Sequence, residues 1–388
     1  MPYYRSVGEI PHKRHTAFRK PDGGLYGEEL MGVEGFSADS ALLYHVGLPT
    51  AILDSQLYEA QAATRTPNLP LKPRHYRTHK LDAAGADAVT GRQYLLANDD
   101  CRLSYVVAEN PSPLYRNAIG DECLYIEAGE GRFESVFGAF DFGPQDYIVI
   151  PTSTTYRLIP HGRIRIYAIE ASGHIGPPKR YLTAKGQFNE FSPYCERDLR
   201  GPTEPLIMDE STVDVLVQHR QGWSRLTYAT HPFDVVGWDG CLYPYAFNVA
   251  DFEPITGRVH QPPPVHQVFE GSNFVICNFV PRKVDYHQDS VPVPYNHANV
   301  DSDEVMFYCG GNYEARKGAG IEQGSISLHP GGFTHGPQPG AAEGSIGAEF
   351  FDELAVMVDT FRPLDVCQGG LACEDSGYAW TWARAADR

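Results

Sequence analysis

Runs of β-branched and aromatic residues, separated by short turns, recur along most of this 388-residue chain. The clearest runs are residues 146–151, 163–170, 273–281 and 325–330. Several of them end in proline, which cannot donate a hydrogen bond to a sheet. Runs of this length and composition are typical of strands in a sandwich or barrel. The hydrophobic pattern therefore predicts an all-β architecture.

One stretch has helical spacing instead. In residues 348–358, the apolar side chains recur at the spacing of a single helix face. These side chains are Phe350, Leu354, Ala355 and Met357. We expect a short amphipathic helix there, beside a barrel, and few other helices. The composition agrees with this picture, because 38 glycines and 30 prolines supply many tight turns.

Comparison of the chain with itself reveals a repeat. Residues 113–129 align without gaps on residues 295–311 when Glu122 is placed on Glu304. Both segments have an asparagine five residues before the glutamate, an aspartate one residue before it and a glycine seven residues after it. This agreement indicates that part of the chain is duplicated.

The likeness returns further along, where residues 151–156 match residues 330–335. The two copies differ at the positions that could bind a metal. The second copy has His297, Glu304 and His335, and the first has Tyr115, Glu122 and Tyr156. A phenol with a pKa near 10 is a poor metal ligand at neutral pH, so we expect the first copy to have lost a metal site that the second retains.

The three residues of the second copy suggest a particular chemistry. A single histidine among fifteen is more often a surface or hydrogen-bonded group, but buried ionisable side chains need a partner, and a metal ion supplies one. Two imidazoles and one carboxylate leave open positions on the ion for a substrate and dioxygen. That arrangement is typical of non-haem Fe(II) oxygenases. We therefore predict that His297, Glu304 and His335 hold a metal ion, with Fe(II), Mn and Zn as candidates.

The charge and composition of the chain limit the classes of molecule that it can bind. The chain has 32 basic and 49 acidic residues, and a formal charge of −17 repels nucleic acid and anionic membranes. We expect neither as a partner. The amino-terminal residues contain no apolar stretch of the signal-peptide kind, and no run of about eighteen apolar residues occurs, so we expect a cytoplasmic protein. The eight cysteines form no close pair and are expected to be mostly buried thiols.

The spacing of His297, Asn299 and Glu304, followed by Pro330 and His335, resembles the two motifs of the cupin superfamily. Residues 24–45, 232–240, 312–319 and 327–337 narrow this resemblance to the homogentisate 1,2-dioxygenase family. The resemblance implies a bicupin of two jelly-roll barrels, with an arm and a barrel without metal in residues 1–195 and a catalytic barrel in residues 196–388.

The same resemblance implies a function. Enzymes of that family use Fe(II) and O2 to open the ring of homogentisate, giving maleylacetoacetate, in tyrosine and phenylalanine breakdown. They assemble as trimers or hexamers. Carried over to this chain, the family's iron ligands are His297, Glu304 and His335, Tyr313 contacts the substrate, and His329 lies near the iron, where it contacts the substrate or moves a proton. His260 matches the acid–base catalyst, with His266 as its rival.

The chain also departs from the family. Six residues separate His297 from Glu304 where five are expected, and the arginine expected to hold the substrate's carboxylate is missing before His297. Arg282 or Arg316 could take its place. The substrate is therefore homogentisate or another hydroquinone, such as gentisate. Two other readings stay open: a Mn- or Zn-dependent isomerase or hydrolase, in which the metal acts as a Lewis acid, and a storage-like bicupin without a metal.

Overall fold

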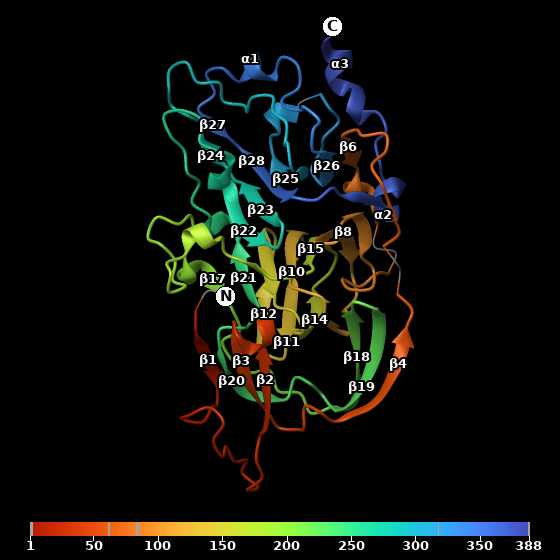
Figure 1. Cartoon of the computed structure of the whole chain (residues 1–388), viewed down its shortest axis with the longest axis vertical. Helices are drawn as coiled ribbons and strands as arrows, with labels where there is room; N and C mark the ends of the chain where they lie inside the picture. The colour runs from red at the N-terminus through yellow and green to blue at the C-terminus, as the bar shows by residue number, and fades with distance from the viewer. Residues whose placement is uncertain (1–2, 61–62, 83–84, 317, 387–388) are drawn as a thin grey trace. The chain divides into compact units, whose positions relative to one another are not determined.

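The computed structural model describes residues 3–60, 63–82, 85–316 and 318–386 (Figure 1). Strands run through these residues from β1 (Arg5–Gly8) to β29 (Asp365–Cys367). The α-helices are short: α1 (Ala341–Ser345), α2 (Gln368–Ala372) and α3 (Thr381–Ala386). The prediction of an all-β chain with few short helices is confirmed. None of the helices in the described ranges combines the length and the apolar character needed to cross a membrane.

The chain divides into two compact units that interleave in sequence. Unit 1 consists of Met1–Ala62, Ala83–Arg92 and Val106–Asn248, and unit 2 consists of Ala63–Asp82, Gln93–Tyr105 and Val249–Arg388. Between residues 63 and 105, the first and last segments thus belong to unit 2 and the middle segment belongs to unit 1. The division after residue 195 stays a proposal about where the duplicated halves meet.

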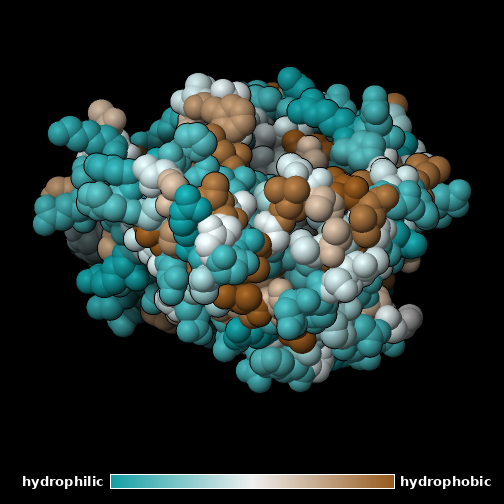
Figure 2. Space-filling view, turned by 90° about the horizontal axis from the view of Figure 1, so that it is seen from below, coloured by the Kyte–Doolittle hydropathy of each residue, from teal (hydrophilic) through white to brown (hydrophobic). Residues whose placement is uncertain are grey.

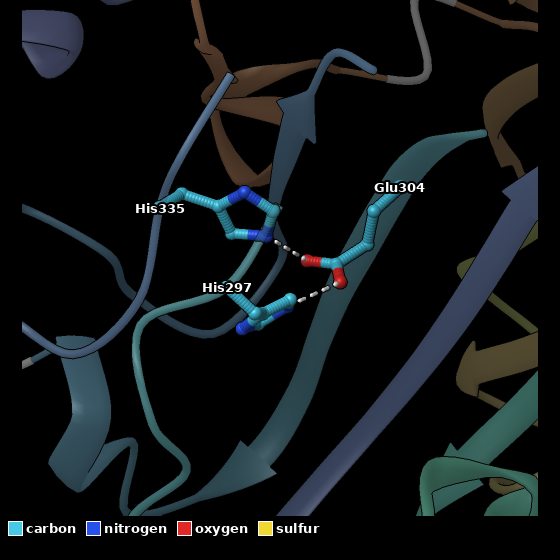
Figure 3. Close-up of side chains that lie close together, drawn as sticks. All are labelled: His297, Glu304 and His335. Carbon is cyan, nitrogen blue, oxygen red and sulfur yellow. Dashed lines mark ion pairs between the residues drawn. The ribbon is translucent and has the colours of Figure 1, made fainter. Parts of the chain in front are cut away.

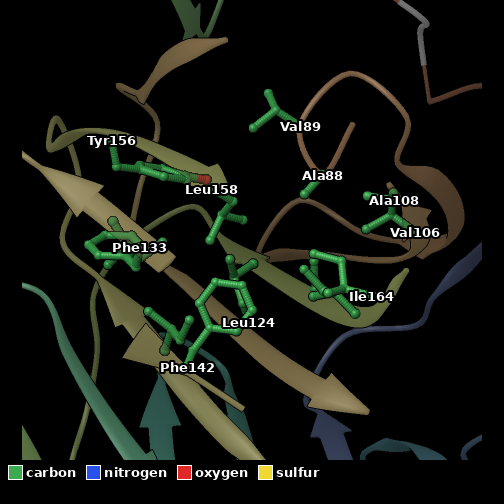
Figure 4. Close-up of a cluster of buried hydrophobic side chains, with 14 of the residues drawn as sticks. Ala88, Val89, Val106, Ala108, Leu124, Phe133, Phe142, Tyr156, Leu158 and Ile164 are labelled. Carbon is green, nitrogen blue, oxygen red and sulfur yellow. The ribbon is translucent and has the colours of Figure 1, made fainter. Parts of the chain in front are cut away.

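Unit 1 contains two sheets around a hydrophobic core. In the first, the strand order is β17 (Leu199–Arg200), β21 (Tyr245–Asn248), β13 (Asp146–Ile150), β10 (Glu122–Ala128) and β15 (Ile164–Ala171). In the second, it is β12 (Gly138–Phe142), β11 (Gly131–Ser135), β14 (Thr155–Pro160), β9 (Leu114–Asn117), β18 (Ser211–His219), β19 (Gly222–Thr230) and β4 (Ile52–Tyr58). Leu124, Phe133 and Ile164 are among the buried side chains that form the core (Figure 4). Burial of such side chains stabilises the fold by roughly 1.5–3 kcal/mol each.

The amino-terminal arm forms a separate sheet within unit 1. Its strand order is β1, β20 (Val235–Gly240), β3 (Ser40–His45) and β2 (Gly27–Gly32), all antiparallel. The face of the molecule in Figure 2 is mixed, with small groups of hydrophobic side chains between hydrophilic ones. At the edge of the second sheet, β4 exposes Leu53 and Leu57, which are 62% and 81% accessible.

Unit 2 is built on an antiparallel sheet that carries the predicted metal ligand Glu304. The strand order is β22 (Gln267–Gly271), β23 (Phe274–Phe279), β28 (Glu353–Thr360), β25 (Asp303–Gly311), β26 (Ser325–His329) and β6 (Arg74–Tyr76). Two further short strands, β24 (Arg282–Lys283) and β27 (Phe350–Phe351), form a separate two-stranded antiparallel sheet. The four runs predicted as strands correspond to β13, β15, β23 and β26, as expected.

The helix predicted at residues 348–358 is wrong. These residues form β27 and most of β28, which pairs with β23 on one side and β25 on the other. Residues 354–358 are all buried. A central strand that is covered on both faces has a continuous apolar run, which cannot be distinguished from a buried helix by periodicity alone.

Candidate metal centre

Glu304 is fixed by its place in the sheet. It is the second residue of β25, where it pairs with His329 of β26 and with Asp359 of β28. Glu304 is buried, and the two neighbouring strands hold its backbone. The carboxylate of Glu304 is therefore attached to a rigid strand, and a precise site requires such rigid support.

The two histidines come from two loops that are joined to each other. The backbone N–H of His297 donates to the carbonyl of His335, and the N–H of His335 donates to the carbonyl of His297, both at 2.8 Å. The loop before His335 turns at Gly332, whose φ of 77° lies in the left-handed region that favours glycine. This double hydrogen bond brings the two imidazole rings to a centroid distance of 4.4 Å.

The three predicted ligands converge (Figure 3). His297 Nε2 lies 3.5 Å from Glu304 Oε2, and His335 Nε2 lies 3.3 Å from Glu304 Oε1. One ligand atom from each residue lies within 4.8 Å of the others. The structure thus brings His297, Glu304 and His335 to one point.

The second ring nitrogens show that this cluster fits a metal ion. His297 Nδ1 lies 3.1 Å from the carbonyl of Tyr295, and His335 Nδ1 lies 3.0 Å from the carbonyl of Phe333. Each Nδ1–H can donate to that carbonyl, which leaves the Nε2 lone pair for a metal, as in most metal-binding histidines. His335 Nε2 is buried and has no hydrogen-bond partner among the described residues. Two imidazoles and a carboxylate are a donor set that suits Fe(II).

The electrostatics of the cluster keep Glu304 ionised. Burial alone would raise its pKa, but the adjacent imidazoles of His297, His329 and His335 outweigh burial and hold the pKa of Glu304 well below its usual range. The adjacent Glu304 carboxylate in turn raises the pKa of His297. The cluster is thus an anionic carboxylate surrounded by imidazoles.

His329 lies behind the ligands. It is fully buried, and its ring stacks on that of His335 at a centroid distance of 4.2 Å. Its Nδ1 lies 2.8 Å from Glu304 Oε1 and its Nε2 lies 2.9 Å from the Tyr378 hydroxyl. Burial lowers the pKa of His329 to about 3, so the ring is neutral at ordinary pH. His329 therefore contacts two of the predicted ligands directly.

A cavity of about 200 Å³ opens beside the cluster. His297 and Glu304 line it together with apolar side chains such as Phe279, Met306 and Phe351. For comparison, a protein cavity of about 150 Å³ can hold benzene. The cavity therefore has room for a single aromatic ring next to the three converging ligands.

Both candidate acid–base histidines line this cavity. His260 Nδ1 lies 3.6 Å from Asp285 Oδ2, and the side chain is 36% exposed. His266 is buried, its ring packs on Phe279 at 4.4 Å, and its Nδ1 has no hydrogen-bond partner among the described residues. Burial lowers the pKa of His266 to about 3, and Arg282 adds to the effect.

Tyr313, predicted to contact the substrate, packs its ring edge-on against Tyr308 at 4.9 Å. The described lining of the cavity includes Tyr308 but neither Tyr313 nor His329. Tyr313 thus packs against a residue that lines the cavity, and its contact with substrate remains a prediction.

Two residues at the site were missed by the sequence analysis. Asp359 lines the cavity beside Glu304, and burial and the charge of Glu304 together raise the pKa of Asp359 to about 8. Tyr378 reaches His329 from 49 residues further along the chain. The pairing of Glu304 with Asp359 follows from strand register, which the motif spacing did not reveal.

Known protein families match most of the chain. The family model described as "Homogentisate 1,2-dioxygenase N-terminal" matches residues 75–249, and the one described as "Homogentisate 1,2-dioxygenase C-terminal" matches residues 254–387. Among solved structures, a cupin 2 conserved barrel domain protein from Leptotrichia buccalis covers 75% of this chain and 97% of its own, at 9% identity and a TM-score of 0.38. That structural similarity is too low to add to the argument.

Relatives in other organisms agree with the family models. The "Putative dioxygenase" of Saccharolobus solfataricus is 40% identical over 98% of this chain and 99% of its own length. The homogentisate 1,2-dioxygenase of Emericella nidulans is 29% identical over 66% of this chain, a match that spans only 60% of that enzyme. The corresponding enzyme of Rhodopseudomonas palustris is 25% identical over 80% of this chain and 72% of its own. The chain therefore belongs to the homogentisate 1,2-dioxygenase family and is a ring-cleaving dioxygenase.

Proposed function

We propose that this protein uses Fe(II) and O2 to open the ring of homogentisate, giving maleylacetoacetate, or the ring of a closely related hydroquinone. The observation that carries the proposal is the convergence of His297, Glu304 and His335 at the edge of a cavity with room for one aromatic ring. Bound Fe(II) would supply the redox chemistry that lets triplet O2 react with a closed-shell aromatic ring. The protein supplies the binding, the orientation and the proton transfer.

The apolar lining of the cavity orients the ring and excludes water. Phe279, Met306 and Phe351 are among its lining residues. An aromatic substrate that packs against these side chains buries apolar surface, while its polar groups meet the few polar side chains. Exclusion of water from such a site strengthens the electrostatic interactions within it.

A phenol that binds a metal must give up its proton, and a neutral histidine can accept that proton. We favour His260 over His266 for this role. Asp285 lies beside His260 and can stabilise the positive charge that the ring gains. The low pKa of His266, about 3, makes it a weaker acceptor at neutral pH.

Arg282 is our candidate to hold the carboxylate of homogentisate. It lines the cavity, and its guanidinium lies over the ring of Phe279 and 3.3 Å from Glu353 Oε2. Arg316 also lines the cavity, but its guanidinium donates to the Tyr308 hydroxyl and to the carbonyl of Gly336. Arg316 is also buried, whereas Arg282 is only half-buried, so Arg316 is less free to bind a ligand.

On the basis of the family resemblance, we also propose that the protein forms a homo-oligomer, a trimer or hexamer, and that it is located in the cytoplasm. The exposed apolar residues of the edge strand β4 support self-association, because a second copy would cover them.

The test is oxygen uptake by protein reconstituted anaerobically with Fe(II), with homogentisate, gentisate and simple hydroquinones offered in parallel. We expect one O2 consumed per ring opened for at least one substrate. His335→Ala should abolish uptake while the protein stays folded, because it removes a ligand. The matched control is His161→Ala, which changes an exposed histidine of unit 1 and should keep wild-type uptake.

Absence of uptake with every ring substrate, in folded and iron-loaded protein, would contradict the proposal. The alternative would then be a metal-dependent isomerase or hydrolase, in which Mn or Zn acts as a Lewis acid. Loss of folding in His335→Ala would instead indicate a metal whose role is structural.

A further inference from the structure

Two carboxylates face the cavity from neighbouring strands of unit 2. Glu304 of β25 and Asp359 of β28 are direct partners in the antiparallel ladder, and both line the cavity. Side chains of directly opposed residues lie on the same face of a sheet, with Cβ atoms about 4.5–5.5 Å apart. Asp359 Oδ1 is shielded from solvent and has no hydrogen-bond partner among the described residues.

The same pair of carboxylates occurs in unit 1. Glu122 of β10 is the ladder partner of Glu170 of β15, in the register that Glu304 and Asp359 share in unit 2. The other positions of the repeat also correspond, because Tyr115 is the ladder partner of Tyr156 and His297 is bridged to His335. Both units therefore place two acidic side chains at equivalent points.

In unit 1 a cation of the chain itself lies between the two carboxylates. Arg92 Nη1 lies 2.5 Å from Glu122 Oε1 and 2.5 Å from Glu170 Oε1. Its Nη2 donates to the Tyr156 hydroxyl at 3.1 Å. Arg92 thus contacts the counterparts of Glu304, Asp359 and His335, and all of these unit 1 side chains are buried.

Within the described residues of unit 2, no lysine or arginine forms an ion pair with Glu304 or Asp359. The ion-pair partners of Glu304 are His297, His329 and His335. Arg316 approaches the site, but its guanidinium donates to Tyr308 and Gly336. Two buried carboxyl groups side by side do not both ionise readily unless a cation lies near both.

We propose that Asp359 is a second carboxylate of the metal centre, which lies outside the ligand set and raises the affinity of the site for a divalent cation. The inference rests on the metal centre of the proposed function. The cation would have the role in unit 2 that Arg92 has in unit 1. Asp359 is not among the three residues whose ligand atoms converge, so it acts through the attraction between its negative charge and the bound cation.

The experiment is an anaerobic calorimetric titration of the metal-free full-length protein with Co(II), a spectroscopically visible probe for divalent metal. Asp359→Asn keeps the shape but cannot become negatively charged when the cation binds, and it should weaken Co(II) binding roughly 10- to 100-fold. Asp359→Glu restores the charge and should bind close to wild type. Glu170→Gln, the matched change in unit 1, should leave the Co(II) affinity unaltered.

The inference is overturned if folded Asp359→Asn binds Co(II) as tightly as the wild type, or if Glu170→Gln weakens binding to the same extent. Should Asp359→Asn fail to fold, Asp359→Val removes the charge without adding a buried polar group, and the same comparison applies. Oxygen uptake by the wild type is measured on the same preparations. Its absence would contradict the dioxygenase function without changing the affinity comparison, so the two failures can be told apart.

Discussion

His329 makes hydrogen bonds through both ring nitrogens. A carboxylate only accepts, so Nδ1–H donates to Glu304, and Nε2 accepts from the Tyr378 hydroxyl. With a pKa of about 3, the ring stays neutral and this pattern is stable at ordinary pH. We therefore expect His329 to orient Glu304 rather than to exchange protons with the substrate.

Substitution of His329 by Ala should therefore lower the metal affinity roughly 10- to 100-fold, the usual effect of removing a partner that orients a ligand. Tyr378→Phe leaves the Nδ1 hydrogen bond intact and should have a smaller effect. Metal titration and the substrate KM of metal-saturated enzyme check this. Unchanged metal affinity with lost turnover would instead favour the proton-transfer role that the family resemblance gives to His329.

The three converging ligands were predictable from the sequence because the repeat marks their positions. His297 and His335 stand where the first copy has two tyrosines, and this contrast singled them out. Asp359 was not predictable in the same way, since it lies 55 residues after Glu304 and meets it only through the register of β25 and β28. Motif spacing reports neighbours along the chain, whereas ladder partners depend on the sheet.

Among the elements, the arm sheet of unit 1 contains a pH-sensitive junction. His45, the last residue of β3, lies with Nδ1 2.6 Å from Asp234 Oδ1 and Nε2 3.1 Å from Glu29 Oε2. Burial alone would lower the pKa of His45, but the hydrogen bonds to Asp234 and Glu29 outweigh it and raise the pKa to about 9. The protonated ring thus joins β2, β3 and the residue that precedes β20.

Stability should depend on pH through this junction. The folded-state pKa of His45 lies above the value of about 6.5 in an unfolded chain, so its contribution is complete below about pH 6.5 and is lost as the pH rises through about 9. The shift corresponds to roughly 3 kcal/mol. Thermal unfolding of wild type and His45→Gln should therefore differ most near about pH 6 and converge above about pH 10.

His161→Gln is the control for that comparison, because His161 is exposed. A difference between wild type and His45→Gln that stays constant with pH would mean that the junction stabilises the arm by packing alone.

The helix predicted at residues 348–358 was wrong because contacts with neighbouring strands, rather than the local sequence pattern, determine the conformation of this segment. Leu354 to Val358 are consecutive buried residues in a strand with a partner on each side. Helical spacing in this stretch reflects only that most positions are apolar, and the sheet decides the conformation.

Across the whole molecule, the two units neutralise equivalent carboxylate pairs by different means. Unit 1 contains Arg92, a cation that is part of the chain, whereas we propose that unit 2 depends on a bound metal ion. A ligand that binds only the folded state stabilises it, by about 2.7 kcal/mol when its free concentration is about 100 times Kd. That stabilisation should appear in the unit that holds the ligand.

Hydrogen exchange with and without Co(II) should therefore show increased protection in β25, β26 and β28 of unit 2, because these strands carry Glu304 and its ladder partners. The matching strands β10, β13 and β15 of unit 1 should exchange at the same rate in both conditions. His335→Ala should remove the Co(II) effect from unit 2. Equal protection of both units would mean that they open together, since one metal ion would then stabilise strands that it does not touch.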